Sequence, residues 1–139
     1  QALTPGEKVD LLGSAISLNL IRNPGAAFSI GDGATWILTV VSIVILVWVV
    51  VAARKVGTLA WAVALGLLLG GALGNLVDRF FRAPGPGRGH VVDFIDYFGW
   101  FVGNVADIAI VAGAAIIMVL AYRGTPVAGP PHQPEHADV

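Results

Sequence analysis

Two long uncharged segments constrain the fold of this chain more than any other feature. One runs from Gly33 to Ala53 and the other from Val56 to Val77. Both are long enough to cross a membrane, because about 20 apolar residues in a helix span a hydrocarbon layer of about 30 Å. A third segment, from near Trp100 to Tyr122, is interrupted only by Asn104 and Asp107 close to its start. We therefore expect an all-α integral membrane protein with three antiparallel transmembrane helices.

The composition excludes several classes of protein. Of the 139 residues, 56% are hydrophobic and only 12% are charged, as in a small single-domain membrane protein. The net charge of -1 offers no broad basic surface for nucleic acid. The absence of cysteine excludes disulfides, thiolate metal sites and cysteine nucleophiles. We expect no cofactor, no cleavable signal peptide on this chain, and a monomer in contact with membrane lipids.

Charge at the ends of the apolar segments suggests an orientation. Arg54 and Lys55 in the first connection, with Arg123 after the third segment, favour a cytoplasmic location for that end. The connection 79–100 then lies outside the cell, although Arg82 and Arg88 in it oppose the positive-inside rule. Those arginines indicate a role other than topology.

The regions flanking the three apolar segments have a different character. Residues 1–32 should form a small extracytoplasmic β element, since apolar and polar residues alternate through Ile16, Leu18 and Leu20. The triplet 23–25, Asn-Pro-Gly, predicts a turn with positive φ at the glycine. Residues 33–122 should form the transmembrane bundle, and the Pro-rich residues 123–139 a disordered cytoplasmic tail in which His132 and His136 are solvated.

The expected topology gathers seven polar residues at one membrane face. The second apolar segment ends, and the third begins, on the side opposite the basic turn. The residues are Asn23, Asn75, Asp78, Arg79, Asp93, Asn104 and Asp107. Taken singly, the asparagines could simply hold helices together by hydrogen bonds, and Asp78 and Arg79 could pair with each other. Gly66, Gly70 and Gly74 predict a face for close helix packing. His90 and Asp93 lack a third ligand, so no metal site is expected.

Asp107 is the residue that most needs an explanation, because a carboxylate near the middle of a membrane helix costs about 2.5 to 3.5 kcal/mol. Together with Asp93 it would form an acid pair in which one carboxyl stays protonated and polarises a carbonyl while the other deprotonates water. That chemistry is aspartic proteolysis. Two alternatives stay open from the residues alone: a proton-relay subunit of a transporter, and a membrane assembly protein without catalytic activity.

Four blocks of sequence resemble those of lipoprotein signal peptidase, also called signal peptidase II. They are "RNPGAAFS", "GGALGNLVDR", "GHVVDFIDY" and "VGNVADIAI", in the order and at nearly the spacing of that family. The resemblance extends from about Gly6 to Tyr122 and is closest to actinobacterial members. Members have four spans, and this chain begins after the place where the first should end, so we expect a chain that lacks the first transmembrane helix. Its fourth block also reads "VGN" where many members have "FN".

The resemblance implies a function and a role for each polar residue. Asp93 and Asp107 would be the catalytic pair, with Asp96 a nearby rival to Asp93. Asn23, Asn75, Arg79 and Asn104 would bind the substrate, and Asp78 would support the structure. The family removes signal peptides from diacylglyceryl-modified prolipoproteins, cutting before the lipidated cysteine at the outer face of the bacterial cell membrane.

Overall fold

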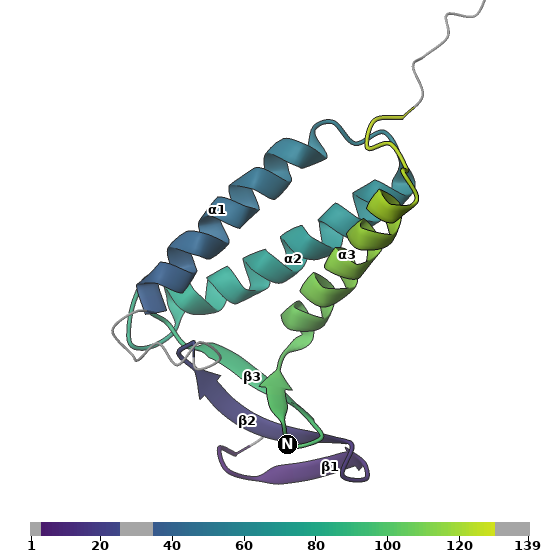
Figure 1. Ribbon diagram of the computed structural model, residues 1–139. Coiled ribbons are helices and arrows are strands. Elements are labelled where there is room, and N and C mark those ends of the chain that lie inside the picture. Colours follow the sequence, from purple (N-terminus) through teal and green to yellow (C-terminus); the bar gives the residue numbers. More distant parts are fainter. Residues whose placement is uncertain (1–3, 26–34, 130–139) are drawn as a thin grey trace, which may run out of the picture.

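The computed structural model describes residues 4–25 and 35–129, which form three long helices above a small sheet (Figure 1). The sheet is antiparallel, with strand order β1-β2-β3-β4. In chain order the elements are β1 (Lys8–Leu12), β2 (Ile16–Asn23), α1 (Thr35–Ala53), α2 (Leu59–Phe81), β3 (Val91–Tyr97), β4 (Phe101–Gly103) and α3 (Val105–Tyr122). The sheet lies at the end of the bundle where α1 begins, α2 ends and α3 begins.

All three helices are long and apolar enough to cross a membrane, as the sequence predicts. Helix α2 lies between α1 and α3 and packs against both (Figure 1). Large apolar side chains point outward from the bundle, among them Val44 at 63% exposure in the middle of α1. Such an outward apolar surface is stable in lipid, where helices satisfy their own backbone hydrogen bonds.

The boundaries of two helices, α2 and α3, differ from the predicted spans. Helix α2 begins at Leu59, after an extended Thr58, and continues beyond Val77 to Phe81. Hydropathy falls at the polar residues near its end, but the helical backbone hydrogen bonds continue through them. The third helix begins at Val105 rather than near Trp100, because Asn104 is extended and caps it.

The β element is larger than predicted. The alternation of Ile16, Leu18 and Leu20 correctly indicated β2, and Gly25 has the predicted positive φ of 119°. The sheet also includes β1, β3 and β4, so the chain is not all-α. Strand β3 occupies the segment 79–100 that the sequence suggested was a loop, because β2 pairs with it from Ile16↔Tyr97 to Asn23↔Val91. The predicted tail is described only to residue 129, and the rest lies outside the described residues.

Glycines bring α2 and α3 into backbone contact, but they are not the three that the sequence suggested. A Cβ on Gly71 would lie 2.5 Å from the Ala106 carbonyl oxygen, and one on Gly113 would lie 2.7 Å from that of Ala64. Of the predicted face, Gly74 faces α3, whereas Gly66 and Gly70 have open space where a Cβ would stand. The predicted close-packing face is therefore wrong for those two, because the spacing of four residues cannot tell which side of a helix meets its neighbour.

Candidate active site

Four elements bring polar side chains together where the sheet meets the helices. Strand β2 ends at Asn23, β3 carries Asp93, the last third of α2 carries Asn75, and Asn104 and Asp107 stand at the start of α3. These residues come from distant parts of the sequence, but hydrogen bonds join their side chains in one cluster.

Asp93 is almost completely buried, with 2% of its surface exposed. Its two carboxyl oxygens accept from different amides: Asn23 Nδ2 donates to Oδ2 at 2.8 Å, and Asn104 Nδ2 donates to Oδ1 at 2.8 Å. The Asn23 side chain is itself fixed by the turn, because its Oδ1 accepts from the backbone N–H of Gly25 at 2.8 Å. The carboxyl group of Asp93 is therefore held from both sides.

Asp107 is joined to the same cluster through α2 and through its own helix terminus. Asn75 Nδ2 donates to Asp107 Oδ1 at 3.0 Å, and the backbone N–H of Asn104 donates to Asp107 Oδ2 at 3.0 Å. Asn104 Nδ2 also donates to Asn75 Oδ1 at 3.1 Å. One residue thus connects the two carboxylates, since Asn104 donates to Asp93 from its side chain and to Asp107 from its backbone.

Asn104 and Asp107 also form a capping box, which the sequence analysis missed. The backbone N–H of Asp107 donates to Asn104 Oδ1 at 3.1 Å, the reciprocal of the contact above. The signal was present in the sequence, as an asparagine followed three residues later by an acid at the start of an apolar helix. The side chain of Asp107 is consequently held in the first turn of α3.

Burial raises the pKa of Asp93 above its ordinary value, because the charged form loses its water. The negative charge of Asp107 raises this pKa too. The hydrogen bonds from Asn23 and Asn104 and the positive charge of Arg79 act in the opposite direction, since they stabilise the ionised carboxylate. Asp93 is thus a carboxyl group whose surroundings favour retention of a proton.

Asp78 and Arg79, at the end of α2, fix the segment that leads into β3. Asp78 Oδ2 accepts from the backbone N–H of Val92 at 2.9 Å, and Oδ1 accepts from Arg82 Nε. Arg79 is 8% exposed, and its Nη1 donates to the Gly89 carbonyl at 3.4 Å. The segment passes so close to the helix that a Cβ on Gly89 would lie 2.4 Å from the Asp78 carbonyl oxygen.

Asp96, the rival to Asp93, is engaged elsewhere on the sheet. Its Oδ2 forms an ion pair with Lys8 Nζ at 3.0 Å, and its Oδ1 accepts from the backbone N–H of Gly99 at 2.8 Å. The hydrogen bond and charge of Lys8 lower the pKa of Asp96, with the Gly99 amide adding to the effect. Asp96 stabilises the sheet and is not bonded to the asparagine cluster.

An apolar groove of about 380 Å³ opens beside Asp107. One wall is aromatic, formed by Tyr97 and Phe101, whose rings stack with centroids 6.1 Å apart. The other is the face of α3 that carries Ile108, Val111, Ala112 and Ala115. A carboxylate at the mouth of an apolar groove can meet a substrate that is partly hydrocarbon and partly peptide.

The chain is similar to known proteins in sequence and in structure. Residues 2–123 match the signal peptidase (SPase) II family model, Peptidase_A8. The lipoprotein signal peptidase of Rhodococcus jostii (strain RHA1) is 54% identical over 122 residues, which cover 88% of this chain and 62% of that protein. That of Mycobacterium tuberculosis (strain ATCC 25618 / H37Rv) is 48% identical over 124 residues, covering 89% and 61%.

A bacterial membrane enzyme solved by the in meso method at 2.3 Å resolution is similar in structure as well. It superposes with a TM-score of 0.75 at 29% identity, over 94% of this chain and 80% of that one. The matched residues cover less than two thirds of the length of the Rhodococcus jostii and Mycobacterium tuberculosis proteins. By sequence and by fold, the chain belongs to the signal peptidase II family.

Proposed function

We propose that this chain carries the active site of an intramembrane aspartic endopeptidase that removes signal peptides from diacylglyceryl-modified prolipoproteins, cutting before the lipidated cysteine. The observation that carries the proposal is the double role of Asn104, which bonds Asp93 through its side chain and Asp107 through its backbone. Two carboxylates held by one residue at the membrane boundary suit a reaction that needs one acid and one base.

The surroundings of the two carboxylates support a division of labour. Asp93, with its raised pKa, holds the proton and donates it to the oxygen of the scissile carbonyl. Asp107 accepts a proton from water as the water oxygen attacks the carbonyl carbon. The resulting tetrahedral gem-diol collapses when Asp107 gives its new proton to the amide nitrogen and Asp93 takes a proton from one hydroxyl of the gem-diol. The C–N bond breaks, the amine leaves as the new amino terminus, a carboxylic acid forms, and both carboxyl groups regain their starting proton states.

The asparagines and Arg79 are proposed to serve this site in two ways. Asn23, Asn75 and Asn104 orient the carboxyl groups, and their amides also stand where a peptide backbone would approach. Arg79 adds positive charge near Asp93 and anchors the segment before β3. Asp78 is proposed to be structural, since it holds the start of β3 against α2.

The substrate's lipid explains the location of such a site. The apolar groove beside Asp107 continues along α3, a helix that can cross the membrane. A diacylglyceryl group can stay among the hydrocarbon chains while the peptide bond next to it reaches the carboxylates. We propose that residues 1–32 and the connection 79–100 lie on the outer side of the cell membrane, and that Arg54, Lys55 and the tail 123–139 lie in the cytoplasm.

The proposal is tested by following cleavage of two peptides that differ only in the diacylglyceryl group on the cysteine. The protein is reconstituted in lipid, with the Rhodococcus jostii relative as a positive control, and products are identified by mass spectrometry. Cleavage immediately before the lipidated cysteine, with no cleavage of the unlipidated peptide, is expected. Cutting at another bond, or equal cleavage of both peptides, would contradict the proposed specificity.

A further inference from the structure

The turn between β3 and β4 presents large aromatic side chains to the outside of the protein. Phe98 is 69% exposed, Trp100 is 94% exposed, and Phe101 at the start of β4 is 51% exposed. Burying a side chain of this size in an apolar environment is favourable relative to leaving it in water. Two such side chains on a single three-residue turn therefore suggest a nonaqueous partner.

The protein holds this turn rigidly in a conformation that directs the aromatic side chains outward. Phe98 has φ of 57°, an uncommon value for an aromatic residue, and its backbone N–H donates to the Ala15 carbonyl at 2.9 Å. The backbone N–H of the next residue, Gly99, donates to Asp96 Oδ1, and the other oxygen of Asp96 is paired with Lys8 across the sheet. The buried carboxylate of Asp96 thus braces the turn, and exposure of its aromatic residues does not result from a loose loop.

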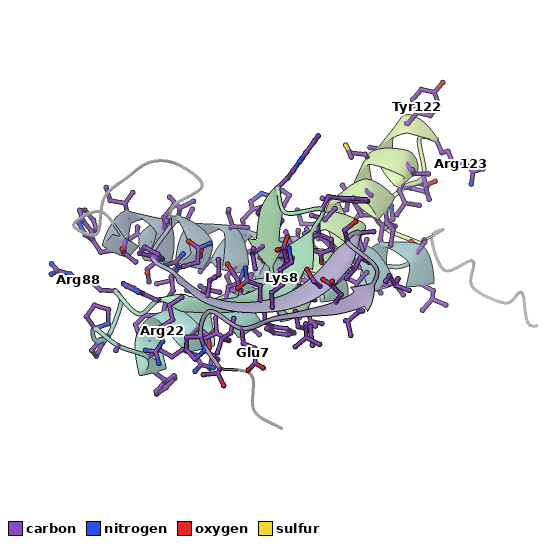
Figure 2. All side chains as sticks on the ribbon, turned by 90° about the horizontal axis from the view of Figure 1, so that it is seen from below. Glu7, Lys8, Arg22, Arg88, Tyr122 and Arg123 are labelled. Carbon is purple, nitrogen blue, oxygen red and sulfur yellow. The ribbon has the colours of Figure 1, made fainter. Side chains whose placement is uncertain are left out.

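The turn belongs to the sheet at the end of the bundle where α1 begins and α2 ends. At the same end of the bundle, Trp36 in the first turn of α1 is 48% exposed, and Phe81, the last residue of α2, is 84% exposed. The first turn of α3 has no aromatic residue, but the β3–β4 hairpin leads directly into it (Figure 1). At the opposite end of α3, Tyr122 points away from the bundle beside Arg123 (Figure 2). Trp and Tyr are enriched at the two membrane–water interfaces, which is the location that Trp36, Trp100 and Tyr122 would have.

We propose that the Phe98–Trp100 turn inserts into the headgroup region of the lipid bilayer next to α3 and anchors the sheet to the membrane surface. The partner is lipid because the turn adjoins a helix that can span the membrane, and because it supplies the aromatic residue that the outer end of α3 lacks. The turn lies between β3, which carries Asp93, and α3, which carries Asp107. Its insertion therefore fixes the depth of both carboxylates relative to the bilayer.

The absence of cysteine from this chain permits a direct test. Phe98→Cys and Trp100→Cys are each labelled with a nitroxide and reconstituted in phosphatidylcholine and phosphatidylglycerol vesicles. Collisions with oxygen, which dissolves in lipid, and with a nickel chelate, which stays in water, are measured by electron paramagnetic resonance. Asp10→Cys on the exposed strand β1 is the water reference, and Val44→Cys in the middle of α1 is the lipid reference.

Both turn positions should show fewer nickel collisions than position 10 and fewer oxygen collisions than position 44, as expected for the interface. Accessibility equal to that of position 10 would overturn the proposal, and dipolar broadening between labels would show instead that a second copy covers the turn.

A second experiment keeps the turn intact, because the nitroxide label replaces one of its aromatic residues. It uses a variant in which Trp36, Trp48 and Trp61 are changed to Phe, so that Trp100 is the only tryptophan. Trp100 fluorescence should then be quenched by lipids brominated near the headgroup, and quenching by aqueous acrylamide alone would contradict insertion. Neither measurement requires cleavage activity.

Discussion

Asn104 Nδ2 lies 2.8 Å from Asp93 Oδ1, so the residue that caps α3 also holds a carboxylate of the sheet. The capping role depends on Asn104 Oδ1, which accepts from the backbone of Asp107, whereas the contact with Asp93 depends on the amide nitrogen. The helix cap and the contact with Asp93 therefore depend on different atoms of one side chain, and substitutions can separate these two contacts.

Asn104→Ser should keep the helix cap and lose the contact with Asp93. Serine is a good N-cap, so the stability of this variant should stay near that of the wild type, whereas Asn104→Ala should lose about 1 kcal/mol. Cleavage by Asn104→Ser should fall on the order of 100-fold, as expected when a catalytic group is misplaced. Thermal unfolding and kcat/KM, measured on both variants, check this. Wild-type activity in Asn104→Ser would show that the bridge to Asp93 is not required.

Asn23→Ala should move the alkaline limb of the pH–rate profile to higher pH. In the proposed mechanism Asp93 is the proton donor, and its pKa is raised above the ordinary aspartate value of about 3.9. The hydrogen bond from Asn23 stabilises the ionised form, so its loss raises the pKa of Asp93 further and keeps the acid protonated to higher pH.

The measurement for Asn23→Ala is kcat/KM against pH, which should be bell-shaped if one carboxyl must be protonated and the other ionised. Val9→Ala, on the exposed strand β1, serves as the control and should leave both limbs in place. A shift of the alkaline limb to lower pH in Asn23→Ala, or no shift, would contradict the role of Asp93 as the acid.

Lys8→Met should destabilise the sheet at neutral pH and have no effect in strong acid. The folded protein lowers the pKa of Asp96, so its ionisation contributes stability that is fully present above the unfolded value of about 3.9. That contribution disappears as pH falls through the lower folded pKa. Thermal unfolding of Lys8→Met and wild type should therefore differ at pH 7 and converge at low pH, with exposed Lys55→Met as the control. A difference that persists unchanged in acid would rule out the ion pair as its source.

Gly71→Ala and Gly70→Ala should have opposite effects although the residues are adjacent. A Cβ at position 71 would lie 2.5 Å from the backbone of Ala106, and separating the helices to admit it should cost about 1 to 3 kcal/mol. Position 70 is open, so alanine there should be neutral or stabilise the helix by up to about 1 kcal/mol. Unfolding measured in detergent distinguishes the two, and equal stability of both variants would contradict the observed packing of α2 against α3.

The sequence allowed prediction of those features that depend on segment length and order. The three spans followed from uncharged segments, and the meeting of Asp93 with Asp107 at one end followed from the antiparallel order of the helices. Strand β3 was missed because its sequence, "VVDFIDY", contains two carboxylates, and such residues are typical of loops. The structure shows why they fit in a strand: Asp93 accepts from Asn104, and Asp96 pairs with Lys8. The end of α2 was missed for a related reason, since the uncharged segment stops before Asp78 while the helix continues to Phe81.

The geometry around the two carboxylates depends on contacts between distant elements. Asn23 and Asp93 are 70 positions apart and meet only because β2 and β3 are paired. The capping box of Asn104 and Asp107 could have been recognised from spacing alone, and it gives Asp107 a second role in addition to the one expected of an acid in a membrane helix.

Cleavage of a diacylglyceryl-modified prolipoprotein peptide by wild type, Asp93→Asn and Asp107→Asn tests the central claim most directly. Each substitution should reduce the rate by at least about 100-fold, the lower end of what a positioned acid or base contributes. Asp10→Asn on the exposed strand β1 is the matched control and should cleave like the wild type, and circular dichroism should show all the variants folded. Full activity in either Asp93→Asn or Asp107→Asn would contradict the catalytic pair.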